Sequence, residues 1–496
     1  MIYPDLKEFR KLSARGNLIP VYREILADME TPVSAFRKID DGRASFLLES
    51  MEGGEKWARY SFLGSRPSVV IKSLGRTVEV TRNGKTLELT SATDPLDAVK
   101  TVLSEYRPVP DPRLPRFFGG AVGFAGYDVV RFFEELPARE KEGLDIPDIF
   151  FMITDTLLIF DNVTHMIKVV SNAHIHGASA TAAYREAVEK IEAIVRKLKQ
   201  GKSSKPGVRS PRKRTGGHAL SSNFTQPQYE QAVLRAKEYI KAGDIFQVVP
   251  SQRFQTKISV EPFEIYRALR LVNPSPYMYF LRCGGETTVV GASPEVMVRL
   301  EGDRIDLRPI AGTRRRGKTE EEDRQLAEEL LADPKERAEH IMLVDLGRND
   351  VGRVSTPGSV NVSELMVIER YSHVMHIVSN VRGRLSGGKD AYDVVRACFP
   401  AGTVSGAPKI RAMEIIDELE PTKRGPYAGA VGYFGFSGNM DTCITIRTLI
   451  VKNGTAYIQA GGGVVADSDP AAEYQETVNK AKAMMRAVEL AEKGLD

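Results

Sequence analysis

The segments GGAVGFAGYD (119–128) and AGAVGYFGFS (428–437) carry the clearest signal of the fold. Each spaces glycines between apolar residues in a run typical of a β-strand, and glycine inside a strand indicates close approach by another backbone. One copy lies in each half of the chain, so we expect two lobes built around facing β-sheets. A chance match between two glycine-rich strands is the alternative.

The sequence before the first copy is rich in strand patterns. They are ASFLLES (44–50), WARYSFLG (57–64), SVVIKSLG (68–75) and TVEVTRNGKTLELT (77–90), the last a hairpin with Asn-Gly at its turn. Residues 94–107 have helical spacing, with Asp94 as a candidate N-cap. Because strands and helices occur in runs rather than in strict βαβ alternation, the predicted class is α+β with largely antiparallel sheets.

A basic segment, residues 201–222, divides the chain into an N-terminal lobe (1–200) and a catalytic region (223–496). Lys and Arg recur between 202 and 214 without an acidic residue. A basic run without interleaved aromatics can be a nucleic-acid-binding tail, but the richness in Lys, Arg, Ser, Pro and Gly favours a flexible solvated linker. The following residues, 225–243, predict an amphipathic helix capped by Thr225 and closed by Gly243.

The composition is that of a soluble globular protein, with 496 residues, 42% hydrophobic and 27% charged. Three scattered cysteines without a CxxC pair favour a reducing compartment and argue against a cysteine-built metal site. No stretch approaches the roughly 18 apolar residues that a membrane span needs. We therefore expect a cytoplasmic protein.

Two pairs of glutamates stand at helical spacing. Glu336 and Glu339 form one pair, and Glu473 and Glu476 form the other, with Lys480 following at i+4. An isolated pair of this kind is usually a solvated helix face. Two pairs on separate helices can instead meet across a cleft, and a set of carboxylates suits Mg²⁺ better than zinc.

Two glycine-rich segments can bring backbone N–H groups to an anion. Residues 400–420 place a Gly/Thr/Ser loop before a helix, and 460–465 place three glycines after a strand-like run. Neither matches a nucleotide-binding motif. Arg447 alternates with apolar residues on a predicted strand, where its charge needs an acidic or anionic partner.

Taken together, several segments resemble the chorismate-utilising enzymes. They are GASPE (291–295), PIAGTRRRG (309–317), EHIMLVDLGRND (339–350), HVMH (373–376), AGTVSGAPK (401–409), ITIR (444–447), GGGVVADSDP (461–470) and EYQETVNKA (473–481). LLES (47–50) and EKWARYSFLG (55–64) are similar to the amino-terminal region of that family's anthranilate synthase branch. The resemblance covers nearly the whole chain outside the basic segment.

The resemblance implies a two-lobed α+β sandwich of facing, largely antiparallel sheets with helices outside. It also implies a Mg²⁺ ion, with Glu339 and Glu476 as direct ligands and Glu336 and Glu473 beside them through water. The substrate-binding residues that it implies for chorismate are Gly402, Thr403, Tyr427, Arg447, Gly461, Gly462, Gly463 and Lys480. Tyr427 as an ordinary packed aromatic is the alternative.

The same resemblance implies the catalytic groups. Glu295 would be the general acid that protonates the departing 4-hydroxyl. His376 would assist the release of pyruvate, with His373 as the alternative and a purely structural histidine also open.

Two positions indicate which reaction of the family to expect. Relatives that add water carry a lysine base where this chain has Gln247, and glutamine cannot deprotonate water. Aminodeoxychorismate synthases carry a nucleophilic lysine where this chain has Ala311. The expected reaction is therefore attack by ammonia at C2 and loss of pyruvate, which gives anthranilate, the first committed step of tryptophan synthesis.

The ammonia source is expected to be a separate glutamine amidotransferase subunit in a hetero-oligomer, because no cysteine sits in a glutaminase motif. The family's tryptophan-inhibitor site corresponds here to Glu49, Ser50, Pro276, Tyr277 and Met278. A buried strand and a simple turn are the alternative for these two segments.

Three other functions remain open at this stage. One is an aminodeoxychorismate synthase, and another is a non-catalytic relative that senses tryptophan. The third is an RNA-binding protein that uses the 202–214 run, which the lack of any nucleic-acid motif disfavours.

Overall fold

The computed structural model describes residues 1–51, 59–82, 84–91, 93–137, 139–177, 179–200, 220–371 and 374–495. The predicted linker therefore lies outside the described residues, apart from its last three positions, as do His373 and Asn83 of the predicted hairpin turn. Within these ranges no helix is long and apolar enough to cross a membrane.

The first large sheet, sheet A, runs from the N-terminal strands to the strands beside the last helix. All of its pairings are antiparallel. In spatial order its strands are β1 (Ile2–Tyr3), β2 (Leu18–Leu26), β11 (Met166–His174), β10 (Thr156–Asp161), β4 (Tyr60–Ser65), β3 (Ser45–Glu49), β15 (Tyr277–Arg282), β16 (Thr287–Ser293), β25 (Thr448–Lys452), β26 (Thr455–Gly461), β14 (Ser251–Lys257) and β12 (Ser221–Ser222).

The second large sheet, sheet B, is also antiparallel throughout. In spatial order its strands are β19 (Ile310–Arg315), β21 (Val374–Arg384), β18 (Arg304–Leu307), β17 (Val296–Glu301), β24 (Met440–Ile444), β23 (Ala430–Gly435), β8 (Gly120–Ala125), β9 (Ile149–Thr154), β5 (Val69–Leu74), β6 (Thr77–Arg82) and β7 (Lys85–Thr90), with β20 (Asn361–Arg370) also on β21. A short pair, β13 (Gln247–Val248) with β22 (Gly406–Ala407), stands apart.

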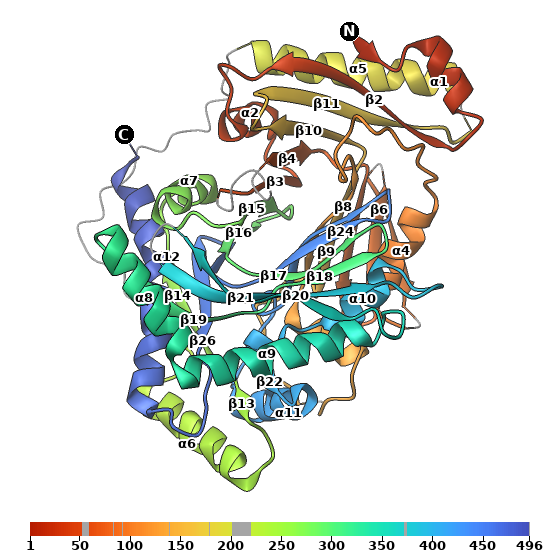
Figure 1. Ribbon diagram of the computed structural model, residues 1–496. Helices are drawn as coiled ribbons and strands as arrows, with labels where there is room; N and C mark the ends of the chain where they lie inside the picture. Colours follow the sequence, from red (N-terminus) through yellow and green to blue (C-terminus); the bar gives the residue numbers. More distant parts are fainter. Residues whose placement is uncertain are drawn as a thin grey trace.

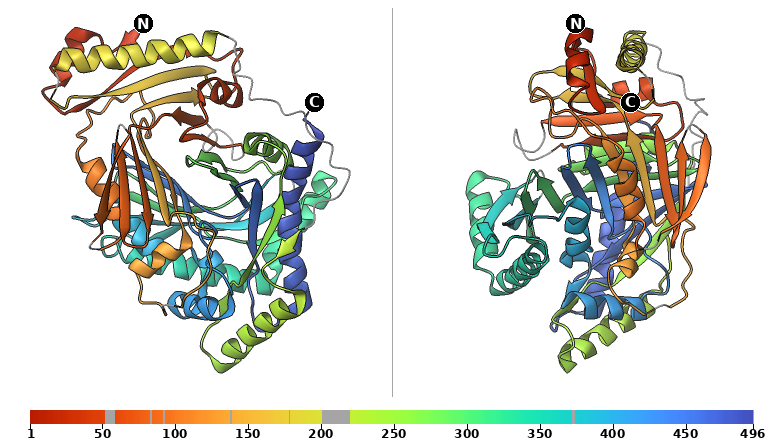
Figure 2. Two further views of the ribbon diagram at one scale, coloured as in Figure 1. Left: turned by 180° about the vertical axis from the view of Figure 1, so that it is seen from behind. Right: turned by 90° about the vertical axis from the view of Figure 1, so that its right-hand side faces the viewer.

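The two sheets face each other across the main apolar core, as Figures 1 and 2 show. Phe62 of sheet A, for example, packs against Tyr433 of sheet B with ring centroids 6.2 Å apart. A second core separates the outer face of sheet A from its helices. The predicted α+β sandwich of facing antiparallel sheets with outer helices is therefore confirmed.

The helices lie on the outside and mostly follow amphipathic patterns. The longer ones are α5 (Ala180–Lys199), α6 (Gln226–Ala242), α9 (Pro334–Gly352) and α12 (Pro470–Lys493); the shorter ones are α1 (Leu6–Leu12), α2 (Pro32–Ile39), α4 (Leu96–Ser104), α7 (Pro262–Val272), α8 (Glu320–Ala332), α10 (Ala391–Cys398), α11 (Lys409–Leu419) and the 3-10 turns η1 (Tyr127–Phe132) and η2 (Gly402–Val404). In α5, Ala187, Ile191 and Val195 are buried at i+4 spacing, which turns one face toward β2 and β11.

The two similar glycine-rich runs form neighbouring strands, β8 and β23, of one sheet. The expectation that they mark two facing sheets was therefore wrong, but the expectation of close backbone approach is confirmed. Gly123 and Gly432 are paired in register. A Cβ on Gly123 would lie 1.8 Å from the Phe150 carbonyl oxygen, and one on Gly432 2.1 Å from that of Asp441.

The helix ends agree closely with the sequence. Thr225 and Gln228 form a capping box at the start of α6, and Gly243 closes the helix in the left-handed conformation. At α4, Asp94 Oδ1 accepts from the Leu96 backbone N–H at 2.8 Å, one residue before the assigned N-cap, Pro95.

Strands from both sides of residues 201–222 contribute to both large sheets. In sheet A, β3 pairs with β15, and in sheet B, β8 pairs with β23. The N-terminal lobe and the catalytic region thus share their sheets, and residues of either can line a site between them. The division at 201–222 itself stays a prediction.

Candidate active site

Two glutamate-bearing helices meet at a pair of glycines that follow β26. A Cβ on Gly462 would lie 2.8 Å from Glu473 Oε2 and 3.7 Å from Glu476 Oε1, both of α12. A Cβ on Gly463 would lie 3.7 Å from Glu339 Oε1 of α9. The absence of side chains at these two positions therefore leaves room for carboxylates from two helices to converge.

Gln247 joins the carboxylates from β13. Its Nε2 donates to Glu339 Oε1 at 2.8 Å, which fixes the orientation of the amide, because only the NH₂ end can donate. Its Oε1 points elsewhere, is buried, and accepts no hydrogen bond from the part of the chain that the structure describes. A buried acceptor of this kind needs a donor from a ligand or from water.

The electrostatic environment favours a cation among these carboxylates. Burial raises the pKa of Glu339, and the charges of Glu336 and Glu476 raise it further. Burial also raises the pKa of Glu473. Lys480 Nζ forms an ion pair with Glu476 Oε1 at 2.5 Å, so part of the negative charge is already offset.

The same residues suit an oxygen-preferring divalent ion. In the described ranges, no group of three or more His, Cys, Asp or Glu side chains is arranged to share one metal. The donor chemistry still fits Mg²⁺, because Glu473 Oε2 is buried without a partner among the described residues and lies beside the other carboxylates. Glu336 is half-buried, and its Oε1 accepts from Arg314 Nη1 at 3.0 Å. The four-ligand assignment stays a prediction.

Arg447 lies between β24 and β25, in the left-handed conformation with φ of 51°. The prediction of a strand through this residue was wrong, because the alternating pattern of ITIRTLIV continues across the break. Burial lowers the pKa of its guanidinium. Within the described ranges no hydrogen bond or ion pair holds that group, so the side chain is available to an anion.

Lys480 and Tyr427 are close to the same region. Arg447, Glu476 and Lys480 line one cavity of about 450 Å³. Lys480 Nζ donates to the Gly461 carbonyl at 2.9 Å, and the Tyr427 hydroxyl is 2.9 Å from where a Gly461 Cβ would lie. Burial raises the pKa of Tyr427 to about 12, so its hydroxyl is a neutral donor at neutral pH.

Glu295 is buried in the turn between β16 and β17, only 7% exposed. Thr403 Oγ1 donates to its Oε1 at 3.0 Å. Burial raises the pKa of Glu295 to about 8, which keeps the carboxyl protonated at neutral pH. Gly402, which lines the same small cavity, contacts α9 so closely that a Cβ would lie 2.2 Å from Leu346 Cδ2.

His376 is half-buried on β21. Its Nδ1 is 2.9 Å from the Gly312 carbonyl oxygen and 3.1 Å from Thr313 Oγ1. Because a carbonyl only accepts, Nδ1 carries the proton in the neutral ring, and Nε2 is then the acceptor nitrogen. Tyr371 packs edge-on against the ring. The competing residue, His373, lies outside the described residues.

Glu295 and Glu476 line different cavities, but the segments around the two glutamates share their supports. Helix α9 carries Glu339 near its start and Leu346, which contacts Gly402, two turns later. Gln247 pairs in register with Ala407, four residues after Thr403. A change in either support therefore affects both groups.

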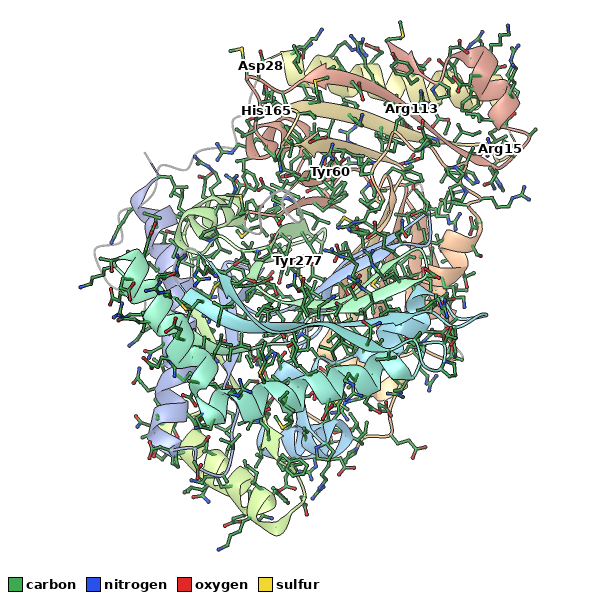
Figure 3. The ribbon with its side chains drawn as sticks, viewed as in Figure 1. Arg15, Asp28, Tyr60, Arg113, His165 and Tyr277 are labelled. Carbon is green, nitrogen blue, oxygen red and sulfur yellow. The ribbon has the colours of Figure 1, made fainter. Side chains whose placement is uncertain are left out.

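The predicted inhibitor residues all line one cavity of about 380 Å³ between the two sheets, where Tyr277 and Tyr60 are labelled in Figure 3. They are Glu49, Ser50, Pro276, Tyr277 and Met278. Glu49 and Met278 are register partners on β3 and β15. The structure thus brings together two segments more than 220 positions apart in the sequence.

Glu49 is anchored at the back of this cavity. Tyr266 OH donates to its Oε2 at 2.5 Å, and Arg270 Nε lies 3.1 Å from the same oxygen. Burial raises the pKa of Glu49, against the effect of the Arg270 charge. The carboxyl is therefore held in one orientation rather than left to solvent.

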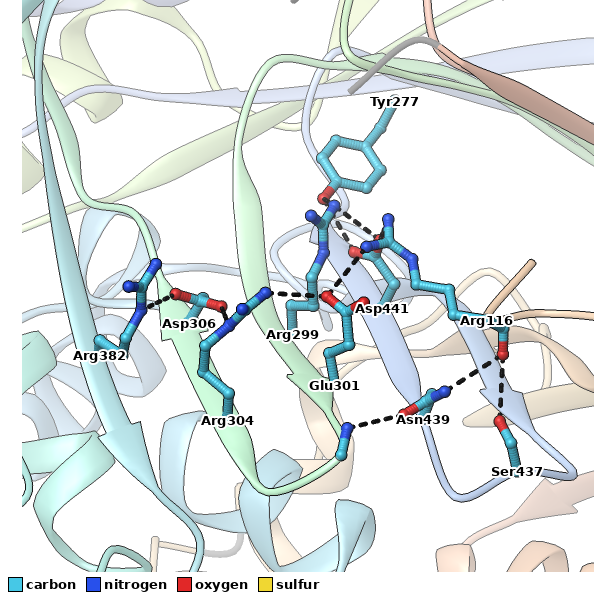
Figure 4. A network of polar contacts seen from close by, with 11 residues as sticks. Arg116, Tyr277, Arg299, Glu301, Arg304, Asp306, Arg382, Ser437, Asn439 and Asp441 are labelled. Atoms are coloured by element: carbon cyan, nitrogen blue, oxygen red, sulfur yellow. Dashed lines mark hydrogen bonds and ion pairs between the residues drawn. The ribbon is translucent and has the colours of Figure 1, made fainter. Parts of the chain in front are cut away.

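Sequence reasoning missed the charged wall of this cavity, shown in Figure 4. Arg299 Nη2 lies 2.7 Å from Asp441 Oδ2 and donates to Tyr277 OH at 3.0 Å, and Tyr277 OH donates to Asp441 Oδ1 at 2.9 Å. Arg116 adds a second contact to Asp441 at 3.3 Å. A charged residue inside the apolar strand patterns VMVRLE and MDTCI was the available signal.

The three cysteines of the sequence, Cys283, Cys398 and Cys443, are all buried and unpaired. Burial raises the pKa of each thiol. A thiol in this state is not an activated nucleophile. None of them is therefore suited to glutamine hydrolysis.

Comparisons with known proteins agree with this geometry. The family model described as "chorismate binding enzyme" matches residues 45–486. The chain is 49% identical to anthranilate synthase component 1 of Acetivibrio thermocellus, over 99% of both chains. It is 50% identical to that of Aquifex aeolicus, over 98% of both chains. A crystal structure of anthranilate synthase component I from Streptococcus pneumoniae superposes with a TM-score of 0.74 at 37% identity, covering 93% of this chain and 98% of that one.

Proposed function

The chain belongs to the chorismate binding enzymes, and from this we propose that it converts chorismate and ammonia into anthranilate and pyruvate. The observation that carries the proposal is identity near 50%, along almost the whole chain, to relatives named anthranilate synthase component 1. This reaction is the first committed step of tryptophan biosynthesis. We expect it to take place in the cytoplasm.

The choice of ammonia over water rests on Gln247. An amide cannot take a proton from water, so the nucleophile must arrive already nucleophilic, as ammonia does. The buried Oε1 of Gln247 has no partner in the described part of the chain and is an acceptor suited to an incoming N–H donor. Ala311 offers no amine for a covalent adduct, which disfavours the aminodeoxychorismate reaction.

Chorismate binding is assigned to the cationic and glycine-rich elements. Arg447, Tyr427 and the backbone of Gly462–Gly463 would hold the enolpyruvyl carboxylate, and Lys480 and Thr403 would orient the ring carboxylate. Glu339, Glu476, Glu473 and Glu336 would hold Mg²⁺, directly or through water. When bound, the ion would neutralise the ring carboxylate beside these glutamates.

Glu295 and His376 are assigned to the proton transfers. As ammonia forms the N–C2 bond, the C4–O bond breaks, and protonated Glu295 supplies the proton that lets the hydroxyl leave as water. The added nitrogen then loses a proton, which restores Glu295. His376 would next take the C2 proton while the C3–O bond breaks, which makes the ring aromatic, and protonation of the released enolate at its methylene carbon gives pyruvate.

The ammonia is proposed to come from a glutamine amidotransferase subunit, in a hetero-oligomer with this chain. The name "component 1" of the relatives supports a two-component enzyme. The buried, unactivated cysteines support the same assignment, because none can attack glutamine.

Tryptophan is the proposed inhibitor, bound in the cavity between the sheets. The cavity combines the Glu49 carboxyl with apolar and aromatic walls from Pro276, Tyr277 and Met278, a mixture that suits an amphipathic aromatic amino acid. The strand that follows Glu295, β17, carries Arg299 in the cavity wall. A ligand there would therefore contact the element that positions the acid.

The reaction assignment is tested with a charge-adding substitution at Gln247. Wild type, incubated with chorismate, Mg²⁺ and an ammonium salt, should form anthranilate, and Gln247→Lys should lose amination and release some isochorismate. Gln255→Lys, at an exposed position of β14, is the matched control and should keep anthranilate formation. A wild-type product of aminodeoxychorismate or isochorismate would overturn the assignment.

A further inference from the structure

A buried ion pair between Arg424 and Glu420 lies behind the candidate active site. The two side chains are only 2% and 3% exposed. Arg424 Nη2 donates to Glu420 Oε1 at 2.5 Å, and its Nε donates to Glu420 Oε2 at 2.9 Å. Glu420 follows the end of α11, and the pair therefore joins α11 to the segment that leads to Tyr427.

The remaining donors of Arg424 bind two backbone carbonyls. Nη1 donates to the Val404 carbonyl at 2.7 Å, and Nη2 donates to the Val249 carbonyl at 2.7 Å. Val404 follows Thr403, the partner of Glu295, and Val249 lies two residues after Gln247. One planar guanidinium thus fixes the distance between the segments that carry the proposed acid's partner and the proposed nucleophile-selecting amide.

The face of the guanidinium contacts two tyrosine rings. Its carbon lies 5.5 Å from the ring centroid of Tyr427 and 4.6 Å from that of Tyr127. Burial raises the pKa of Tyr427, and the nearby Arg424 charge opposes this effect. Arg424 therefore also supports the ring assigned to the substrate carboxylate.

Glu420 extends the same network to the glycine-rich loop. Its Oε1 accepts from both the backbone N–H and the hydroxyl of Ser251 at 2.8 Å. The preceding residue, Pro250, accepts through its carbonyl from the Gly462 N–H at 3.3 Å. Glu420 holds Ser251, and the neighbouring Pro250 in turn helps to position Gly462 at the carboxylate cluster.

The geometry points to Arg424, with Glu420, as a positioning residue of the reaction, one that fixes four site segments relative to one another. These segments are 247–251, 402–405, 424–427 and 461–463. The inference rests on the proposed function, since it assigns Arg424 a role in that site. Arg424 contacts no reacting atom and acts through the residues that it holds.

Stability alone does not account for such a pair. Removing two charges from water is costly, and apolar residues of similar volume often replace a buried ion pair without loss of stability. What apolar residues cannot do is donate to the Val404 and Val249 carbonyls at fixed angles. The pair is therefore expected to matter more for the arrangement of the site than for folding.

The test is the double variant Glu420→Gln/Arg424→Met. Glutamine keeps an acceptor for Ser251, methionine keeps most of the side-chain length, and no unpaired charge remains. The variant should unfold near the wild-type temperature, yet its kcat should fall by about 10² and its KM for chorismate should rise, because site segments are displaced.

Arg131→Met is the matched control. Arg131 Nη2 lies 2.5 Å from Oδ1 of Asp417, on the same helix α11, and the side chain also contacts Asp128 and the Pro137 carbonyl, none of which belongs to the four site segments. This variant should keep wild-type kcat and KM. Should the double variant also keep wild-type kcat and KM per folded molecule, the positioning role is wrong.

Arg424→Lys provides a second test, which remains valid even if the double variant does not fold. Lysine keeps the charge beside Glu420 but cannot bind both carbonyls from one planar group, so kcat per folded molecule should fall and KM should rise. Wild-type values for this variant would also refute the role. If wild type itself forms no anthranilate, the proposed function is wrong. The positioning role is then still tested by measuring the affinity of each variant for chorismate by calorimetry.

Discussion

Glu295 shows how burial can set a chemical role. A carboxyl with an ordinary pKa would be ionised at neutral pH, but burial raises the pKa of Glu295 to about 8. In the unfolded chain the group ionises near its usual pKa, so between the two values the native state holds a proton that the unfolded state has lost. The free energy of unfolding therefore falls as pH rises from 5 to 8. At pH 7 it is roughly 3 kcal/mol lower than at acidic pH, where the carboxyl is protonated in both states.

Replacing Glu295 with Gln should remove both the general acid and the loss of stability that its raised pKa causes at neutral pH. Anthranilate formation should fall by about 10² or more, because general acid catalysis is worth that much. The melting temperature at pH 7.5 should rise relative to wild type, and the difference should vanish near pH 4, where the wild-type carboxyl is protonated in both states. Calorimetric scans across this range measure it.

Glu88→Gln, at an exposed position of β7, is the control and should change neither quantity. A Glu295→Gln variant with full activity, or with the same stability difference from wild type at both pH values, would contradict the assignment.

The paired glutamates carry the metal prediction. Glu339→Gln and Glu476→Gln each remove a charge while keeping shape, and each should lower the Mg²⁺-dependent rate by roughly 10² or more. Mg²⁺ should also protect these variants less against thermal unfolding than it protects wild type. Glu489→Gln, exposed on α12, is the control. Full activity of both site variants with Mg²⁺ present would contradict the metal assignment.

At the scale of single residues, the sequence predicted groups whose chemistry is unusual. Glu295 is buried, Gln247 donates to Glu339, and Arg447 lines a cavity with Glu476 and Lys480, while their roles in catalysis stay predictions. Arg424 and Glu420 were missed, because an arginine in PTKRGPY reads as a surface turn until the fold shows that the pair is buried. Burial is a tertiary property that local pattern does not carry.

Among the elements, the turn after β26 leaves no room for a side chain at Gly463. A Cβ on Gly463 would lie 2.5 Å from Gln247 Nε2, which holds Glu339. Gly463→Ala should push the amide away from Glu339 and lower kcat by about 10-fold or more, with little change in unfolding temperature, since the backbone at this position is not left-handed.

The matched control is Gly352→Ala at the end of α9, where an added Cβ meets no atom within 4 Å. It should behave as wild type in both assays. Wild-type kinetics for Gly463→Ala would contradict the role given to this turn.

Element patterns predicted strands and helices better than they predicted which sheet holds them. The similar runs of β8 and β23 pair with each other, because the same glycine spacing that permits close approach works between neighbours in one sheet. The strand drawn through Arg447 was wrong since alternation of apolar residues persists where the backbone turns left-handed. β2 was missed because the adjacent charges of Arg23 and Glu24 interrupt the apolar run of LIPVYREIL.

At the scale of the molecule, the sandwich places a ligand cavity between its sheets. β3 and β15 of sheet A and β17, β23 and β24 of sheet B all contribute residues to it. The Ile444 backbone N–H at the end of β24 donates to the Glu295 carbonyl at 3.0 Å. A ligand in the cavity can oppose catalysis only by binding one arrangement of these strands more tightly than another.

Ser50→Phe should fill this cavity from its rim. Chorismate turnover should stay near wild type, since the metal and carboxylate-binding residues lie elsewhere, and inhibition by tryptophan should be lost. Ser104→Phe, at the exposed end of α4, is the control and should remain sensitive. Inhibition curves with increasing tryptophan measure both. Unchanged sensitivity of Ser50→Phe would refute the assigned site while leaving the catalytic assignment intact.

The central claim, that this chain aminates chorismate at C2 with free ammonia, is tested most directly by isotope balance. The pure chain is incubated with chorismate, Mg²⁺ and ¹⁵N-ammonium, and in parallel with amide-labelled glutamine, and the products are identified by mass. We expect anthranilate with one ¹⁵N and an equal amount of pyruvate from ammonium, and neither product from glutamine. Labelled aminodeoxychorismate, unlabelled isochorismate, or labelled anthranilate from glutamine would contradict the claim.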